Sequence, residues 1–180
     1  MKVRKLYYIC IMNLPEAKEK FIQSWGSLGS KWGINRTMAQ IHALFLITDE
    51  LLSAEEIMDT LKISRGNANM NIRTLIDWGL VYKEYKTGER KEFFRGEKDI
   101  WKVTQRVIKA RQRQELDPML DVLSQLQHIE ADTKNKKEVE AFTKQIKNIK
   151  SFAELADNSL TKISGSEENW FLKTFMKFIK

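Results

Sequence analysis

Residues 53–81 read SAEEIMDTLKISRGNANMNIRTLIDWGLV, and this stretch decides the fold. Ser53 and Glu56 have the spacing of a capping box, in which each side chain binds the other residue's unpaired backbone N–H group at a helix start. Ser64 follows a short turn and is a suitable second N-cap, and Gly79 ends the second helix. The stretch predicts two capped helices joined by a tight turn, which is a helix-turn-helix.

The second helix of the pair has two different faces. Ala68, Ile72, Leu75 and Ile76 recur at helical spacing and predict a core face. The opposite face carries polar side chains of the kind that read DNA, since arginine can pair with guanine and asparagine with adenine. We expect the following residues on or near the exposed face to contact bases: Arg65, Asn67, Asn69, Met70 and Arg73.

Other residues near the two helix starts are suited to the DNA backbone. Gly66 lies in the first turn of the second helix and permits close approach to a phosphate. Ser64, Thr37 and Lys62 are candidates for phosphate contacts, which set the position of a protein on DNA without reading its sequence.

A β-hairpin is predicted directly after the second helix. Residues 80–85 and 91–95 have strand character, and the turn between them contains Gly88. A hairpin in this place is the wing of a winged helix. Its basic residues are candidates for DNA contact, with Arg90 best placed to enter a narrow minor groove, although solubility alone explains any single lysine equally well: Lys83, Lys86, Arg90 and Lys91.

The positive charge of the chain is concentrated in the same region. Residues 62–113 hold 14 basic and 6 acidic residues, a balance of +8, whereas the other 128 residues hold 17 and 18, a balance of −1. A basic segment of this kind indicates a polyanionic partner. The alternative from charge alone is an ordinary solvated face.

The rest of the chain reads as helices. Asn13 and Pro15 predict the start of a helix that runs toward residue 30, with Phe21, Ile22, Trp25 and Leu28 at helical spacing. A largely buried helix is expected at 37–47 and another helix at 97–115. Asp117 and Pro118 predict an N-cap and a restart, with these residues inward: Met119, Val122, Leu123 and Leu126.

A heptad pattern then follows in the last third of the chain. Its apolar positions step by three and four residues, and they are Val139, Phe142, Ile146, Ile149, Ala153, Ala156 and Leu160. This seam fits a dimer interface and the interior of one chain's own helical bundle equally well. An aromatic helix is expected at 167–179, where covering an apolar surface is favoured over lying on a membrane.

We therefore predict a mainly α protein with a small β-hairpin wing, in three parts. Residues 1–36 form an N-terminal helical segment that packs on the DNA-binding domain, residues 37–96 form the winged helix-turn-helix, and residues 97–180 form helices for dimerisation and effector binding. One winged helix makes few base contacts, so a homodimer on a pseudo-palindromic site in double-stranded DNA is expected.

Several short motifs together resemble the MarR superfamily of winged-helix regulators. They are GINR at 33–36, SRGNANMN at 64–71, WGLV at 78–81 and GERK at 88–91, and in combination they look like its GbsR branch. The likeness covers about residues 20–115 and implies a homodimeric DNA-binding transcriptional regulator, often a repressor and sometimes controlled by a small molecule. Some members of the GbsR branch bind choline-type ligands.

Other functions have little support in the sequence. His42 and His128 stand alone without a catalytic partner, so no enzyme is expected, and no metal site or cofactor is indicated. The single Cys10 is typical of a reducing cytoplasm, and the apolar run before Asn13 is too short to span a membrane.

Two further possibilities stay open. Trp25 and Trp32, with Tyr7 and Tyr8, could form an aromatic cage for a quaternary ammonium effector, although aromatic residues at helical spacing more often belong to a core. The main alternative function is a winged-helix module that binds proteins and not DNA.

Overall fold

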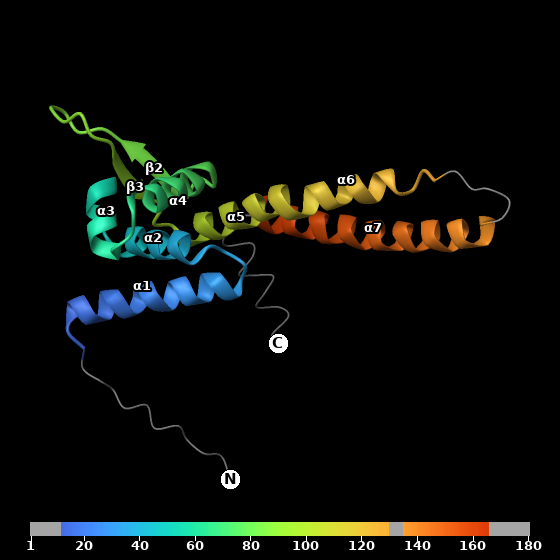
Figure 1. Cartoon of the computed structure of the whole chain (residues 1–180), viewed down its shortest axis with the longest axis horizontal. Helices are drawn as coiled ribbons and strands as arrows, with labels where there is room; N and C mark the ends of the chain where they lie inside the picture. Colours follow the sequence, from blue (N-terminus) through green and yellow to red (C-terminus); the bar gives the residue numbers. More distant parts are fainter. Residues whose placement is uncertain (1–11, 130–134, 166–180) are drawn as a thin grey trace, which may run out of the picture. The chain divides into compact units, whose positions relative to one another are not determined.

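The computed structural model describes residues 12–129 and 135–165, and these residues form two compact units that divide after Lys98 (Figure 1). The first unit contains four helices and a small antiparallel sheet, and the second unit is helical. The predicted fold class, mainly α with a winged helix-turn-helix, is confirmed. The helix expected at 167–179 lies outside the described residues.

Helix α1 (Leu14–Lys31) lies along α2 (Arg36–Ile47) in the first unit (Figure 1). Its start is fixed locally, because the backbone N–H of Glu16 donates to Asn13 at 3.0 Å and the Glu16 carboxylate accepts from the Asn13 N–H. The two helices approach closely at Gly29, where a Cβ would lie 2.6 Å from the Cβ of Ala39. Leu28, which was predicted at helical spacing with Phe21, Ile22 and Trp25, is 44% exposed.

The predicted helix-turn-helix consists of α3 (Ala54–Leu61) and α4 (Arg65–Asp77). The Ser53–Glu56 capping box is present at the start of α3. Lys62 ends this helix in the left-handed conformation, with φ 53°, and Ser64 then caps α4 by accepting from the backbone N–H of Asn67. The core beneath the pair is closed by three fully buried side chains, Phe45, Ile57 and Leu75.

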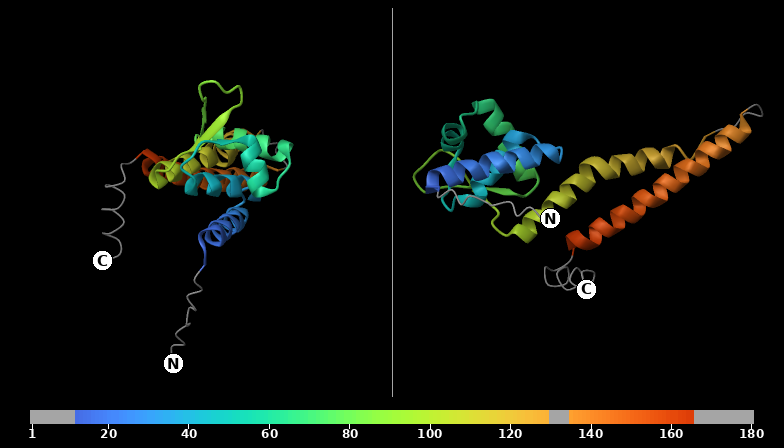
Figure 2. Two further views of the ribbon diagram at one scale, coloured as in Figure 1. Left: turned by 90° about the vertical axis from the view of Figure 1, so that its left-hand side faces the viewer. Right: turned by 90° about the horizontal axis from the view of Figure 1, so that it is seen from below.

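A three-stranded antiparallel sheet completes the first unit, in the order β1-β3-β2. Strands β2 (Val81–Glu84) and β3 (Phe93–Gly96) form the predicted wing, which projects from the body of the unit (Figures 1 and 2). The third strand, β1 (Leu52–Ser53), was not predicted. It has two residues and pairs Leu52 with Phe94, which lies 42 positions along the chain, so no local pattern reveals it.

In the second unit, α5 (Ile100–Arg111), the π-helical turn η1 (Gln112–Leu116) and α6 (Asp117–Gln125) follow one another without a break. They lie beside α7 (Lys136–Gly165), which runs in the opposite direction (Figures 1 and 2). A new α-helical segment with Pro118 in its first turn begins at Asp117, as predicted, but Asp117 is not its N-cap, because this residue is itself helical. Its N–H donates to the carbonyl of Gln112, five residues back, and this wide turn lets the helix accommodate Pro118, which lacks an N–H.

The predicted inward face of α6 is only partly correct. Leu123 is buried, but Met119 and Val122 are 54% and 47% exposed. The heptad seam on α7 is divided in the same way, with Ile146 buried against the second unit's own helices and Phe142 and Ile149 both 43% exposed. One neighbouring helix therefore covers only part of the wide apolar face of α7.

Candidate nucleic-acid interface

The exposed face of α4 carries four of the five predicted base-reading residues. Ala68, Ile72 and Leu75 are 0%, 2% and 1% exposed and hold the helix on the core. Ile76, the fourth predicted core residue, is half-buried. The opposite face presents exposed side chains, and these are Arg65, Asn69, Met70 and Arg73.

Arg65 is available for a partner outside the chain. Its guanidinium lies 3.8 Å from the carboxylate of Glu55, and both side chains are more than half exposed, at 73% and 66%. An exposed pair at this distance contributes little free energy, about 0–1 kcal/mol, so Arg65 can exchange Glu55 for a base or a phosphate. Gly66, the next residue, has no atom within 4 Å of its Cβ position, so the first turn of α4 is open.

Asn67 lies differently from the other four residues. It is half-buried, and its amide is engaged at both ends: the oxygen accepts from Asn71 at 2.7 Å, and the nitrogen donates to the hydroxyl of Thr37 at 3.4 Å. Asn71 was not identified from the sequence and is only 3% exposed. The available signal was its spacing of four residues from Asn67, which places two amides side by side on a helix.

The candidate phosphate contacts lie beside the start of α4. Thr37 is half-buried in the first turn of α2, and its hydroxyl is joined to α4 through Asn67. Lys62 and Ser64 are exposed in the turn that precedes α4. Two helix starts thus lie close together here, and the unpaired backbone N–H groups of a helix start favour anions.

The tip of the wing is a hydrogen-bonded turn. The N–H of Glu89 donates to the carbonyl of Lys86 at 3.1 Å, and Gly88 adopts a φ of +84°, a conformation that favours glycine. The ammonium of Lys86 lies 4.0 Å from the ring centre of Phe93, which fixes this lysine over the hairpin by a cation–π contact.

The four basic residues of the wing differ in their partners. Lys83 forms an ion pair with Glu92, whose carboxylate raises the pKa of the lysine, and Lys91 lies 3.5 Å from Glu89. No ion pair is found for Arg90 within the part of the chain that the structure describes, and the residue is exposed. Arg90 therefore offers a less neutralised charge than Lys83 or Lys91.

The base of the wing contains a cation that the sequence analysis did not single out. Arg95 lies with its guanidinium 5.0 Å from the ring centre of Tyr82 and 3.2 Å from the carboxylate of Glu84. These contacts cross between β3 and β2 and stiffen the hairpin that presents Arg90.

The two tryptophans proposed for an effector cage do not come together. Trp25 packs between the rings of Phe21 and His42, at centroid distances of 5.5 and 6.2 Å. Trp32 is the C-cap residue of α1 and is 63% exposed. Tyr7 and Tyr8, the other members of the predicted cage, lie outside the described residues, as does Cys10.

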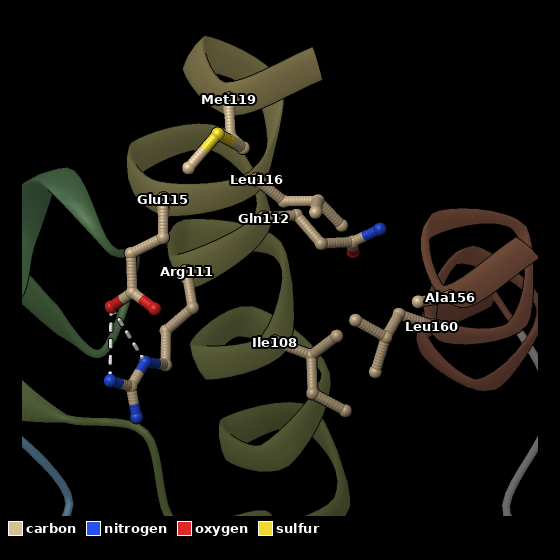
Figure 3. A pocket seen from close by; sticks show the side chains of 8 residues that line it. All are labelled: Ile108, Arg111, Gln112, Glu115, Leu116, Met119, Ala156 and Leu160. Atoms are coloured by element: carbon tan, nitrogen blue, oxygen red, sulfur yellow. Dashed lines mark hydrogen bonds and ion pairs between the residues drawn. The ribbon is translucent and has the colours of Figure 1, made fainter. Parts of the chain in front are cut away.

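An apolar groove lies in the second unit, between α5, η1 and α6 on one side and α7 on the other (Figure 3). Its volume is about 440 Å³, Ile108 and Leu116 point toward Ala156 and Leu160 across it, and Met119 also lines it. Arg111 forms an ion pair with Glu115 at 2.9 Å on the same helical segment.

Residues 12–129 and 135–165 contain neither a candidate metal site nor a candidate membrane span. No group of three His, Cys, Asp or Glu side chains in these ranges could hold a metal ion. Within the same ranges, no helix combines the length and the apolar character needed to cross a bilayer. His42 is buried, and its Nε2 atom has no hydrogen-bond partner in this part of the chain.

Comparison with known proteins agrees with this geometry. Residues 32–90 match the family model described as MarR family. No curated protein sequence matches the chain. A crystal structure of a transcriptional regulator shares the fold, with a TM-score of 0.51 and 19% sequence identity over 83% of this chain and 99% of the other. Residues 32–90 are therefore similar to the MarR family, and the solved structure supports the fold.

Proposed function

We propose that the protein is a sequence-specific regulator of transcription that binds double-stranded DNA, within the GbsR branch that its motifs resemble. The observation that carries the proposal is the division of α4 into a buried face and an exposed face led by Arg65, Asn69 and Arg73, directly before a basic wing. The MarR family match supports the same function. In this arrangement α4 enters the major groove and Arg90 reaches the neighbouring minor groove.

Homodimerisation is the second part of the proposal. We name four exposed apolar residues on α7 the outer stripe: Phe142, Ile149, Phe152 and Leu155. Phe152 and Leu155 are 74% and 63% exposed, and a helix face of this kind is covered in most proteins. A second copy of the chain could bury this stripe and bring two recognition helices to two half-sites of a pseudo-palindrome.

Repression and a response to a small molecule complete the proposal. A dimer that covers a promoter site excludes other proteins from it, so repression is the expected direction of control. An apolar effector would enter the groove lined by Leu116, Met119 and Leu160, because Trp25 and Trp32 lie apart. The probes are an aromatic acid, which has an apolar ring for this groove, and choline and glycine betaine, which the likeness to the GbsR branch suggests. A probe that binds should raise the melting temperature further with each increase in its concentration.

The DNA-binding proposal is tested by affinity for duplex DNA at several salt concentrations. Binding should weaken steeply as salt rises, because each phosphate contact releases counterions. Arg65→Ala should change the preferred sequence, with a loss of about 1–3 kcal/mol at one base pair, whereas Lys86→Ala should weaken binding to all sequences alike. Absence of binding, or binding independent of salt, would instead favour a protein-interaction module.

The dimer proposal is tested by sedimentation of the full chain. Phe152→Glu places a charge in the centre of the outer stripe and should shift the protein to monomer at concentrations where the native chain is a dimer. Ser151→Glu is the matched control, because Ser151 is exposed next to the stripe and outside it. Equal dimer fractions in the two variants would place the interface elsewhere.

A further inference from the structure

The hydrogen bonds around Asn67 have a fixed direction. The side-chain nitrogen of Asn71 lies 2.8 Å from the backbone carbonyl of Asn67, and a carbonyl can only accept, so this atom of Asn71 is the donor. The same nitrogen lies 2.7 Å from one atom of the Asn67 amide, and that atom must therefore be the oxygen. It follows that the amide nitrogen of Asn67 faces the Thr37 hydroxyl and donates to it.

The direction of these bonds decides what the Thr37 hydroxyl can do. Its oxygen receives a hydrogen bond from Asn67, so its own proton points away from that contact. No acceptor for this proton is found among residues 12–129 and 135–165 of the chain. Thr37 lies in the first turn of α2, next to the first turn of α4, where the backbone dipoles of both helices favour an anion.

We propose that Asn71 and Asn67 are positioning residues that aim the Thr37 hydroxyl proton at a phosphate of the bound DNA, and that Asn67 reads no base. This inference rests on the proposed DNA-binding function. It changes the role that the sequence suggested for Asn67, which was a contact to adenine, and it adds Asn71 to the residues on which DNA affinity depends.

The burial of Asn71 disfavours an orientation in which the Asn67 side chain turns outward to contact a base. An asparagine that reads adenine turns the amide edge that carries its oxygen and its nitrogen toward the base, whereas here the oxygen is directed to Asn71 and the nitrogen to Thr37. Turning Asn67 outward would leave the amide of Asn71, only 3% exposed, without one of its acceptors, and unpaired buried polar groups are costly. Asn69 is exposed two positions further on and is not subject to this constraint.

The test compares four variants of the full chain with a matched control. Each is mixed with a pool of random DNA duplexes of about 30 base pairs, enough for two half-sites, and the bound duplexes are sequenced. Thr37→Val removes only the hydroxyl and should lower affinity at least tenfold for every duplex, since a hydrogen bond to a charged group is lost. Asn67→Ala should have a similar effect, and the double variant should bind no more weakly than the weaker single variant.

Two measurements distinguish a positioning role of Asn67 from a merely structural one: the preferred DNA sequence of each variant, and the affinity that is restored when Thr37 is replaced by another residue with a hydroxyl. Thr37→Ser keeps a hydroxyl and should restore affinity, and neither Asn67→Ala nor Thr37→Val should change the preferred sequence. Asn69→Ala, the control, should change it at one position. Melting curves show whether Asn67→Ala folds, and if it does not, Thr37→Val and Thr37→Ser decide the question.

Two results would overturn the inference while leaving DNA binding intact. The first is a change of preferred base in Asn67→Ala, and the second is unchanged affinity in Thr37→Val. If instead the native chain retains no duplex from the pool, the proposed function itself fails, and this inference fails with it.

Discussion

Acid should destabilise the first unit through His42. The imidazole is 6% exposed in the interface between α1 and α2, beside the ring of Trp25. Burial lowers its pKa from 6.5 to about 4. A proton added to this ring would place a charge where the Nε2 atom has no partner among the described residues.

The sign and size of the effect follow from proton linkage. The unfolded chain takes up a proton at His42 near pH 6.5, and the folded chain does so only near pH 4. Between these values the unfolded state binds more protons, so the free energy of unfolding falls as the pH falls. Above pH 6.5 the neutral imidazole of His42 makes its full contribution to the free energy of unfolding. Below that pH the free energy of unfolding falls by about 1.36 kcal/mol per pH unit, and the loss reaches about 3 kcal/mol at pH 4.

The measurement is urea unfolding of the native chain and His42→Leu, in buffers from about pH 7.5 to about pH 4.5. Tryptophan fluorescence follows the unfolding, and Trp25, which contacts His42, contributes to it. Protonation of carboxylates affects both proteins, so the quantity of interest is the difference between their free energies of unfolding. That difference should move in favour of His42→Leu by about 2–3 kcal/mol across the series.

The other histidine provides the control. His128 is exposed, and His128→Gln replaces a histidine without altering the interface around His42. If the native chain and His42→Leu instead lose stability in parallel, the buried imidazole is not the cause and the reasoning is refuted.

Two pairs of substitutions, each a test and its control, examine the packing and the capping of the winged helix. Gly96→Ala should lower the free energy of unfolding by about 1–3 kcal/mol in urea, because the new Cβ would lie 2.6 Å from that of Phe45. In the control, Gly66→Ala, the new Cβ has no atom within 4 Å, so stability should be unchanged or rise by up to about 1 kcal/mol. Equal losses of stability in the two variants would contradict this explanation. Ser53→Ala removes two hydrogen bonds to Glu56, at 2.7 and 3.3 Å, and should lower the free energy of unfolding by about 1 kcal/mol. Ser53→Thr is its control, because it retains the hydroxyl. Similar losses of stability in both variants would argue against the capping box.

The local signals in the sequence predicted most of the first unit. The capping box at Ser53 and Glu56, the N-cap at Ser64 and the glycine of the wing turn all act within a few residues, so their geometry follows from spacing. The buried face of α4 also followed from helical spacing, because Ala68 and Ile72 lie one turn apart.

Signals that depend on distant partners were missed or misread. Strand β1 exists only because Leu52 finds a partner in β3. Asp117 was expected to be the N-cap of a new helix, but the π turn before it makes this residue helical. Met119 and Val122 were expected to be inward, but α7 covers a different part of the α6 surface, where Leu123 is buried.

The sequence by itself determined the helix-turn-helix, the wing and the concentration of positive charge around them, because these depend on short-range spacing and composition. Only the tertiary structure decided the hydrogen-bond partners of Asn67. Helical spacing put this residue on the exposed face, and a hydroxyl 30 positions away, on a helix that packs beside it, turned its amide inward. Hydrogen bonds between elements depend on how the elements pack, and periodicity within one helix carries no information about that packing.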